Sequence, residues 1–302
     1  MSGIKNLPES VRQRLLNKAH ATNRLFNEIL QYFAIERFLY RISRSNYSDK
    51  FILKGALMFL AWGASIYRPT RDIDFLGFTT NELEAVAKII QEISVQEVEE
   101  DGLAFDPSSV QSERIKEDAD YEGVRVKLTG YLGEAKIPLQ IDIGFADVVS
   151  PAPIMLKYPT ILQMPAPHLR GYPPESVVAE KFHAIVFLGS VNSRMKDFYD
   201  LWVLAEQFEF DGQTLQKAIV NTFQRRNTTL PRETPVGLSN SFAAENQTQW
   251  KSFVKRIHLE DVPESLSVIS QVLNRILIPP IHASASGELF KSIWKPGGPW
   301  NL

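Results

Sequence analysis

The stretch Arg68-Pro-Thr-Arg-Asp72-Ile-Asp74-Phe-Leu76 holds the local pattern from which the rest of the fold can be worked out. From Asp72 to Leu76 polar and apolar residues alternate, which is typical of a β-strand buried on one face. Successive side chains of a strand point to opposite faces, so the two carboxylates share one face and Ile73 and Phe75 the other. The pattern therefore predicts a strand that presents two neighbouring carboxylates.

Two carboxylates held side by side repel each other unless a cation lies near them. Mg²⁺ prefers oxygen ligands and commonly binds through one or two carboxylates, which leaves positions for substrate phosphates. Asp72 and Asp74 are therefore candidate metal ligands. The alternative is a solvated strand face on which Asp72 pairs with Arg71 or Arg68.

A second strand is predicted over Lys136–Ile143, and its core-like part, Leu139-Gln-Ile-Asp142-Ile-Gly144, carries a single acid. Buried acids are rare unless they are paired or bound to a metal. If this strand lies beside the first, Asp142 joins Asp72 and Asp74 in a three-carboxylate site, as used in two-metal nucleotidyl transfer. The alternative is an acid on an edge strand.

Upstream, the apolar run Phe51–Trp62 predicts a buried helix that ends near Gly63, with Lys54-Gly55-Ala56-Leu57 at its opening. A glycine there lets the backbone approach an anion, and the free N–H groups of a helix start favour phosphate. Amphipathic periodicity predicts helices before this run and a further helix over 81–93.

The second half of the chain reads as helical. Seven prolines punctuate Pro151–Pro174, and five helical patterns follow: 174–188, 197–208, 213–223, 245–257 and 263–277. We therefore expect a sheet domain with N-terminal helices (1–150), a Pro-rich connection (151–175), a helical domain (176–278) and a tail (279–302). In the tail, Trp294 and Trp300 either stay loose or dock on the body of the protein.

Charged side chains cluster in two helical segments, Glu180-Lys181-Phe-His183 and Arg194-Met-Lys196-Asp197-Phe-Tyr-Asp200. Cations that face a site of carboxylates and metal suit a triphosphate, which carries several negative charges. The alternative is an ordinary helix start with a pair such as Lys196–Asp200. His183 has apolar neighbours, so we expect it to pack rather than to bind a metal.

The 302 residues include 33 Lys and Arg against 35 Asp and Glu, so any surface that binds anions has to be local. The segment 215–258 is such a region, with seven basic residues, from Lys217 to Arg256, against two acidic ones. Without cysteine there is no disulfide, thiol nucleophile or cysteine-bound metal. No secretory signal and no apolar run of about 18 residues is found, so we expect a cytoplasmic protein without a membrane span.

Taken in order, these segments resemble the AbiEii/AbiGii-type nucleotidyltransferase toxins, a branch of the DNA polymerase β-like nucleotidyltransferase superfamily. The similarity is carried by Phe51–Ala56, Arg68–Leu76, Ile141–Ile143, Glu180–Ala184 and Arg194–Leu201, and it is vague beyond about residue 205. The resemblance implies an α+β fold, with a mixed-sheet catalytic domain and a helical C-terminal domain. It also implies a toxin that transfers nucleotides from an NTP to tRNA acceptor ends and that is neutralised by a cognate antitoxin.

Carried over by position, the resemblance implies a role for each matching residue. Asp72 and Asp74 hold Mg²⁺, Gly55 and Thr70 touch the triphosphate, and Lys181 is the essential lysine. The final acidic motif is Asp197 and Asp200, beside which Arg194 and Lys196 help to hold the nucleotide. The third metal ligand is Asp142 or the nearby Asp147. Ala56 departs from the superfamily, which usually has Ser or Gly there, so no hydroxyl is offered at that position.

The resulting hypothesis is a Mg²⁺-dependent nucleotidyltransferase that uses Asp72, Asp74, Asp142 and Lys181 and acts on an RNA 3′ end. The RNA is expected to lie along the basic stretch Lys217–Arg256. A small-molecule nucleotidyltransferase would use the same carboxylates on a metabolite or aminoglycoside-like hydroxyl. A binding module without activity would keep the fold and need no metal.

Overall fold

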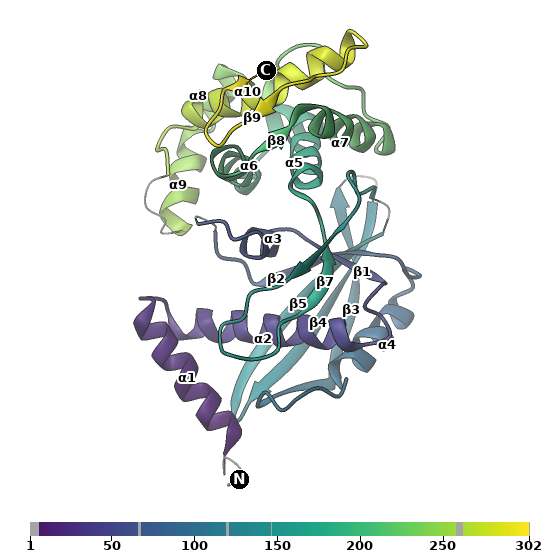
Figure 1. Cartoon of the computed structure of the whole chain (residues 1–302), viewed down its shortest axis with the longest axis vertical. Helices are drawn as coiled ribbons and strands as arrows, with labels where there is room; N and C mark the ends of the chain where they lie inside the picture. The colour runs from purple at the N-terminus through teal and green to yellow at the C-terminus, as the bar shows by residue number, and fades with distance from the viewer. Residues whose placement is uncertain (1–5, 66–67, 119–120, 146, 258–261, 302) are drawn as a thin grey trace. The chain divides into compact units, whose positions relative to one another are not determined.

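The computed structural model describes residues 6–65, 68–118, 121–145, 147–257 and 262–301 (Figure 1). The described residues divide into two compact units. The first draws on Met1–Trp62, Thr70–Ala146 and Ile154–Gly171, and the second on Gly63–Pro69, Asp147–Pro153 and Tyr172–Leu302. No helix in the described part of the chain combines the length and apolarity needed to cross a bilayer.

The first unit is built on a mixed sheet. Its strands are β1 (Phe51–Lys54), β2 (Asp72–Gly77), β3 (Leu103–Asp118), β4 (Tyr121–Leu132), β5 (Ala135–Gly144), β6 (Ile154–Lys157) and β7 (His168–Gly171). They form one seven-stranded sheet in the order β3-β4-β5-β2-β1-β7-β6. β2 is parallel to β5 and β1 to β7, and the other neighbours are antiparallel. The α+β class with a mixed sheet is confirmed.

Helices cover one face of this sheet. The first unit contains α1 (Leu7–Ala21), α2 (Phe26–Arg44), the short α3 (Leu57–Ala61) and α4 (Leu83–Ser94). Figure 1 shows α2 and α4 lying along the sheet, and Phe33, Phe38 and Ile90 of these helices are fully buried in one core with Ile73 and Phe75 of β2. The apolar side of the alternating strand therefore faces the helices, and the carboxylates of β2 lie on the opposite face.

The helix expected over Phe51–Trp62 is wrong in its first half. Phe51–Lys54 form strand β1, which pairs with β2 on one side and β7 on the other. A short apolar run that is buried on both faces cannot be distinguished from a helix by its period, and only the tertiary pairing decides it. Gly55, at φ +73°, ends the strand, and α3 follows within two residues.

The Pro-rich segment 151–175, in which the sequence predicts no strand, contains β6 and β7. Each is only four residues long, too short for a reliable alternation. β7 lies between β1 and the edge strand β6, and its partner β1 is more than 100 residues away along the chain. Non-local pairing of this kind leaves little trace in a local pattern.

The second unit is mainly helical, as predicted. It contains α5 (Pro174–Leu188), η1 (Gly189–Val191), α6 (Met195–Gln207), α7 (Gly212–Arg225), η2 (Val236–Leu238), α8 (Asn240–Glu245), α9 (Gln247–Ile257) and α10 (Leu266–Ala285), where η is a 3₁₀-helix. A small sheet in the order β10-β9-β8 joins β8 (Phe210–Asp211), β9 (Ile293–Trp294) and β10 (Trp300–Asn301).

Helix α10 continues through Pro279 and Pro280, although the pattern predicts its end at Leu277. Pro279 has no N–H, so the carbonyl of Arg275 loses its partner within the helix. The indole N–H of Trp300 donates to that carbonyl at 3.0 Å. Trp294 is fully buried, and its indole N–H donates to the Ala205 carbonyl at 2.7 Å. Of the two alternatives, the tryptophans dock on the helical unit.

Candidate functional site

A row of charged side chains crosses the sheet of the first unit on the face away from α2 and α4. Strand pairing places five residues in register: Lys54 (β1), Asp74 (β2), Asp142 (β5), Arg125 (β4) and Glu113 (β3). Side chains in such a row project from the same face, and direct neighbours are about 5 Å apart at Cβ. Two carboxylates therefore lie at the centre of the row with a cation on each side.

Asp72 lies on the same face as Asp74, two residues earlier in β2. The strand shows the predicted alternation, in which Ile73 and Phe75 are fully buried and both aspartates are partly exposed. β5 lies directly beside β2, which is the arrangement that Asp142 needs in order to join Asp72 and Asp74.

Gly55 makes room for the carboxylate of Asp74. A Cβ at position 55 would lie 2.0 Å from Asp74 Oδ2, which no side chain could tolerate. The φ of +73° is also one that residues other than glycine rarely adopt. Glycine is thus required at the end of β1 for both space and backbone conformation. The neighbouring Ala56 is buried.

Asp142 is bound by Arg125 through two hydrogen bonds. Arg125 Nε donates to Oδ1 at 2.8 Å, and Nη2 donates to Oδ2 at 2.7 Å. Hydrogen bonding to Asp142 is the main cause that raises the pKa of Arg125, and the charge of Asp72 adds to it. The Arg125 guanidinium therefore interacts with Asp142 through hydrogen bonds and with Asp72 through its charge.

A divalent cation fits Asp72 and Asp74 better than it fits Asp142. Two carboxylates on one face supply the hard oxygen donors that Mg²⁺ prefers, and substrate phosphates can complete its coordination. Both oxygens of Asp142, in contrast, accept bonds from Arg125. In the described residues, His, Asp and Glu form no group of three or more that is arranged to hold a metal. The three-carboxylate metal site stays a prediction.

Thr70 lies at the start of this segment, two residues before Asp72. Its backbone N–H donates to the hydroxyl of Tyr32 on α2 at 3.0 Å, which fixes the chain where it enters β2. Thr70 and Gly55 thus belong to the unit that holds the carboxylates, and the predicted contact of either with a triphosphate is untested.

In the second unit a buried ion cluster joins α5 to α6. Lys181 Nζ lies 2.8 Å from Asp197 Oδ1 and 2.8 Å from Asp200 Oδ2. The two aspartates are 0% and 1% exposed, and the lysine side chain 12%. Lys181 therefore bridges two carboxylates that are three residues apart on one helix face, as their spacing predicts.

Two arginines complete the cluster. Arg68 donates to both oxygens of Asp200, at 2.9 and 3.0 Å, and Arg194 Nε lies 2.6 Å from Asp197 Oδ2. Asp200 therefore pairs with Arg68 and Lys181 rather than with Lys196. The sequence offers Arg68 as a partner of Asp72, and its bond to Asp200 is not predicted.

The electrostatics of this cluster keep it ionised. Burial alone would raise the pKa of Asp197 and Asp200, but Lys181 and the arginines outweigh it and lower both. Burial would likewise lower the pKa of Lys181, yet the two aspartates raise it. Desolvation, and then the nearby charge of Lys181, lower the pKa of Lys196. Four cations thus surround two carboxylates, an excess of positive charge that favours an anion.

Asp147, the alternative third ligand, belongs to the second unit. Arg226 donates to its Oδ1 from Nε at 3.1 Å and from Nη2 at 2.9 Å. The same arginine lies 3.2 Å from His183 Nδ1, and His183 Nε2 lies 2.8 Å from Thr228 Oγ1. Burial and then the charge of Arg226 lower the pKa of His183 to about 4. His183 is therefore a neutral packing residue, as predicted.

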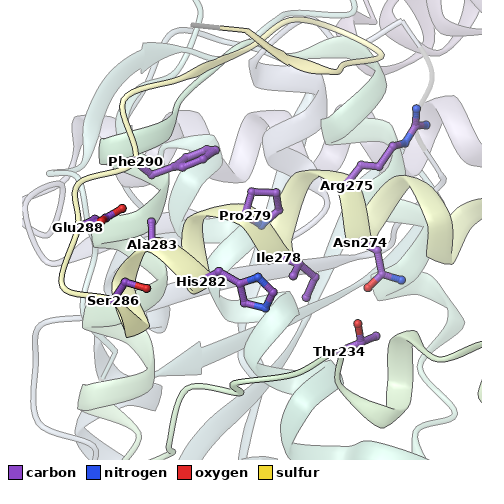
Figure 2. Close-up of a pocket in the computed structure, with 10 residues that line it drawn as sticks. All are labelled: Thr234, Asn274, Arg275, Ile278, Pro279, His282, Ala283, Ser286, Glu288 and Phe290. Carbon is purple, nitrogen blue, oxygen red and sulfur yellow. The ribbon is translucent and has the colours of Figure 1, made fainter.

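A pocket of about 660 Å³ lies in the second unit along α10 (Figure 2). Its lining includes Asn274, Arg275, Ile278 and His282 of that helix, together with Phe290. The predicted site residues are absent from its lining, so this pocket is separate from both charged groups described above.

Three cations of these groups, Lys54, Arg125 and Arg68, were not among the predicted site residues. The first two have a weak signal, because Lys54 follows the apolar run Phe51–Leu53 and Arg125 lies between Val124 and Val126. Their importance follows from register, since Lys54 faces Asp74 and Arg125 faces Asp142. The sequence offers Arg68 only as a partner of Asp72, because Asp200 lies 132 residues further along the chain.

Comparison with solved structures gives two matches from Helicobacter pylori. The crystal structure of JHP933 shares 14% identity at a TM-score of 0.47, covering 84% of this chain and 97% of that one. The crystal structure of a putative nucleotidyltransferase also shares 14% identity, at a TM-score of 0.44, covering 85% and 97%. No curated protein matches the chain.

The family profile described as "Nucleotidyl transferase AbiEii toxin, Type IV TA system" matches residues 37–272. This span is well over half of the chain, and it includes every predicted site residue of both units. The match confirms the family resemblance, and the family implies a cognate antitoxin. The chain therefore belongs to the AbiEii family, the nucleotidyltransferase toxins of type IV toxin–antitoxin systems.

Proposed function

We propose that this chain transfers a nucleotide from an NTP to the 3′ end of an RNA, with tRNA as the acceptor, and thereby blocks translation. The observation that carries the proposal is the carboxylate group of the first unit. Asp74 and Asp142 are register partners on adjacent parallel strands, and Asp72 lies on the same face. Clustered carboxylates next to cations are the arrangement that phosphoryl and nucleotidyl transfer requires.

In this reaction the oxygen of an RNA 3′-terminal hydroxyl forms a bond to the α-phosphorus of the NTP. The bond between the α-phosphorus and its bridging oxygen breaks, and pyrophosphate leaves. Asp72 and Asp74 would hold Mg²⁺, which supplies charge neutralisation to the phosphates when bound. Asp142 Oδ2 accepts from both Arg125 and Gln140, whereas Oδ1 accepts from Arg125 and keeps a further lone pair, which takes the hydroxyl proton.

We assign the buried cluster of the second unit to the phosphates of the nucleotide. Lys181, Arg194, Lys196 and Arg68 exceed Asp197 and Asp200 in charge, and crowding of cations is part of what lowers the pKa of Lys196. An anion of high charge relieves this repulsion. In this assignment Asp197 and Asp200 are positioning residues, which hold Lys181 and the arginines in place.

The decisive experiment is incubation of the protein with each labelled NTP, Mg²⁺ and total tRNA. We expect label at the tRNA 3′ end with one or more NTPs, and at least a hundredfold loss for Asp72→Ala. The matched control is Asp49→Ala, which removes a surface aspartate that is 65% exposed. No transfer with any NTP, or undiminished transfer by Asp72→Ala, contradicts the proposal. Label that appears only in small molecules contradicts an RNA acceptor.

The toxin activity is tested separately by expression in cells. We expect growth arrest by the wild-type chain, and none by Asp72→Asn, a change that keeps the size of the side chain. Lys181→Ala is also expected to abolish arrest, but its loss of a buried charge calls for a check of soluble yield. Arrest that persists in the Asp72→Asn variant would separate toxicity from nucleotide transfer and overturn this part of the proposal.

A further inference from the structure

Helix α9 presents a basic face to solvent in the second unit. Lys251, Lys255 and Arg256 are all exposed, and Thr248 and Ser252 lie between them on the same side. The opposite side buries Trp250 (0% exposed) and Phe253 (5%). From Gln247 to Ile257 the sequence has no acidic residue. The helix is therefore amphipathic, with an exposed side of one charge only.

This concentration of like charge has a cost within the helix. Lys251 and Lys255 are neighbours at i and i+4, and like charges at that spacing destabilise a helix by about 0.2–0.5 kcal/mol. Arg256 lies 5.9 Å from the Phe253 ring, a weak contact at an exposed site. A partner of opposite charge would offset the repulsion.

The helix is firmly held although its basic face is exposed. The indole N–H of Trp250 donates to the Pro263 carbonyl at 2.8 Å, and Gln247 both donates to the Glu264 carbonyl and accepts from the Leu266 N–H. A rigid helix can present its cations at fixed spacing. That property suits the regularly spaced phosphates of a nucleic acid strand.

Helix α9 is also packed against the helix that carries the buried ion cluster. The Phe253 ring lies 5.9 Å from the Tyr199 ring of α6, and Tyr199 is next to Asp200 in the sequence. The apolar side of α9, opposite its basic face, therefore packs against the element that we assign to the nucleotide. Among the other cations of 215–258, Arg226 is engaged by Asp147.

We propose that Lys251, Lys255 and Arg256 of α9 bind the sugar–phosphate backbone of the RNA acceptor. This inference rests on the proposed function and narrows its acceptor surface to one helix face. Because phosphate contacts position a nucleic acid without reading its sequence, the face sets acceptor affinity rather than the choice of nucleotide. The residues touch no reacting atom, so they are binding residues and not catalytic ones.

The test compares two triple variants with the same change of net charge. The first is Lys251→Gln, Lys255→Gln and Arg256→Gln, which leaves Trp250 and Phe253 in place. The control is Lys88→Gln, Lys157→Gln and Lys291→Gln, three exposed lysines outside α9. Binding of fluorescently labelled tRNA is measured by anisotropy over a range of salt concentrations, and folding is checked by circular dichroism.

We expect the α9 variant to bind tRNA at least tenfold more weakly at about 0.1 M salt, while the control stays within twofold. The slope of log affinity against log salt should fall by about 2, since each single-strand phosphate contact contributes about 0.7. In the transfer assay the KM for tRNA should rise while kcat stays unchanged. Binding needs no chemistry, so the readout separates this inference from failure of the transfer reaction.

Two outcomes overturn the inference. One is a wild-type chain that does not bind tRNA at low salt, which would assign the face to a partner other than RNA. The other is an equal loss of affinity in both triple variants, which would make net charge rather than this helix face the cause. A normal transfer reaction in either case would leave the proposed function standing.

Discussion

At the scale of single residues, the carboxylate group depends on one glycine and one arginine. Asp74 Oδ2 occupies the place that a Cβ at position 55 would take, and Arg125 binds both oxygens of Asp142. Neither partner can be recognised from the acidic motif itself. Each lies on a neighbouring strand and meets its aspartate only through the register of the sheet.

Gly55→Ala is expected to abolish nucleotide transfer. The new methyl group displaces the Asp74 carboxylate, and the positive φ adds a cost of about 1–3 kcal/mol. Gly63→Ala is the matched control, because Gly63 has a φ of +75° but nothing within 4 Å of the added Cβ. Urea unfolding should show the cost of the positive φ in both variants and a larger loss of stability in Gly55→Ala, and transfer rates should show loss of activity only in Gly55→Ala. Full activity in Gly55→Ala would show that Asp74 needs no fixed position.

At the scale of elements, two pairs of contacts matter most. Strands β2 and β5 bring the carboxylates of the first unit together, and helices α5 and α6 hold the ion cluster of the second. A buried cluster of this kind is weak evidence for stability, but removal of one member leaves the others unpaired. The cluster can therefore be probed by stability as well as by activity.

Lys181→Met is expected to destabilise the chain by about 3–5 kcal/mol, because Asp197 and Asp200 lose the cation between them. Adding Asp197→Asn should recover part of this loss, since one buried charge is then removed. Denaturant unfolding of both single variants and the double variant gives the coupling energy. Lys88→Met, at an exposed position of α4, is the control and should change stability by less than about 0.5 kcal/mol. Strictly additive effects would contradict the proposed bridge.

Helix α2 carries a titratable group whose effect on stability has a definite sign. Burial raises the pKa of Glu36 to about 7 from 4.5, although Arg37 lies 2.9 Å away and Ile161 N–H donates to it at 2.7 Å. Between these pH values the folded chain holds a proton that the unfolded chain has lost. The free energy of unfolding should therefore fall as the pH rises from about 4.5 to about 7.

Denaturant unfolding at a series of pH values from 4 to 8 measures this dependence. Glu36→Gln should flatten the curve over that range, because the variant has no proton to lose. Glu28→Gln on the same helix is the control, because Glu28 is in a more exposed pair with Arg24, and it should keep the wild-type slope. An unchanged slope in Glu36→Gln would rule out Glu36 as its source.

At the scale of the whole molecule, near-neutral net charge conceals local excesses. The first unit combines clustered carboxylates with flanking cations, and the second combines a cluster richer in cations with the basic face of α9. A chain with 33 basic and 35 acidic residues can therefore still serve two anionic substrates.

Mg²⁺ together with an NTP is expected to raise the thermal midpoint of the wild-type chain. A ligand that binds only the folded state stabilises it by about 2.7 kcal/mol at a hundred times its Kd. Asp72→Asn and Asp74→Asn should each lose the effect of the combination, while Asp49→Asn should keep it. An unchanged midpoint in the wild-type chain would support a binding module without activity, since no nucleotide would then be held.

Some of the fold and site was predictable because it depends on short-range order. The strand Asp72–Gly77 followed from an alternation of five residues, and α5 matched its predicted bounds of 174–188. The sequence predicts a helix over Phe51–Lys54 and no strand at β6 and β7, because strands of four residues have too few positions to show a period. Their burial comes from neighbours distant in sequence.

The sequence by itself determined that Asp72 and Asp74 share a face, that Asp197 and Asp200 share another, and that the order of motifs marks the family. The two shared faces follow from the side-chain period, which is two residues in a strand and 3.6 residues in a helix, and a short stretch of sequence is enough to show it. Only the tertiary structure decided that Arg125 binds Asp142 and that Arg68 binds Asp200. These pairs depend on strand order and on contacts across 17 and 132 positions, which pairing and packing create and no local pattern contains.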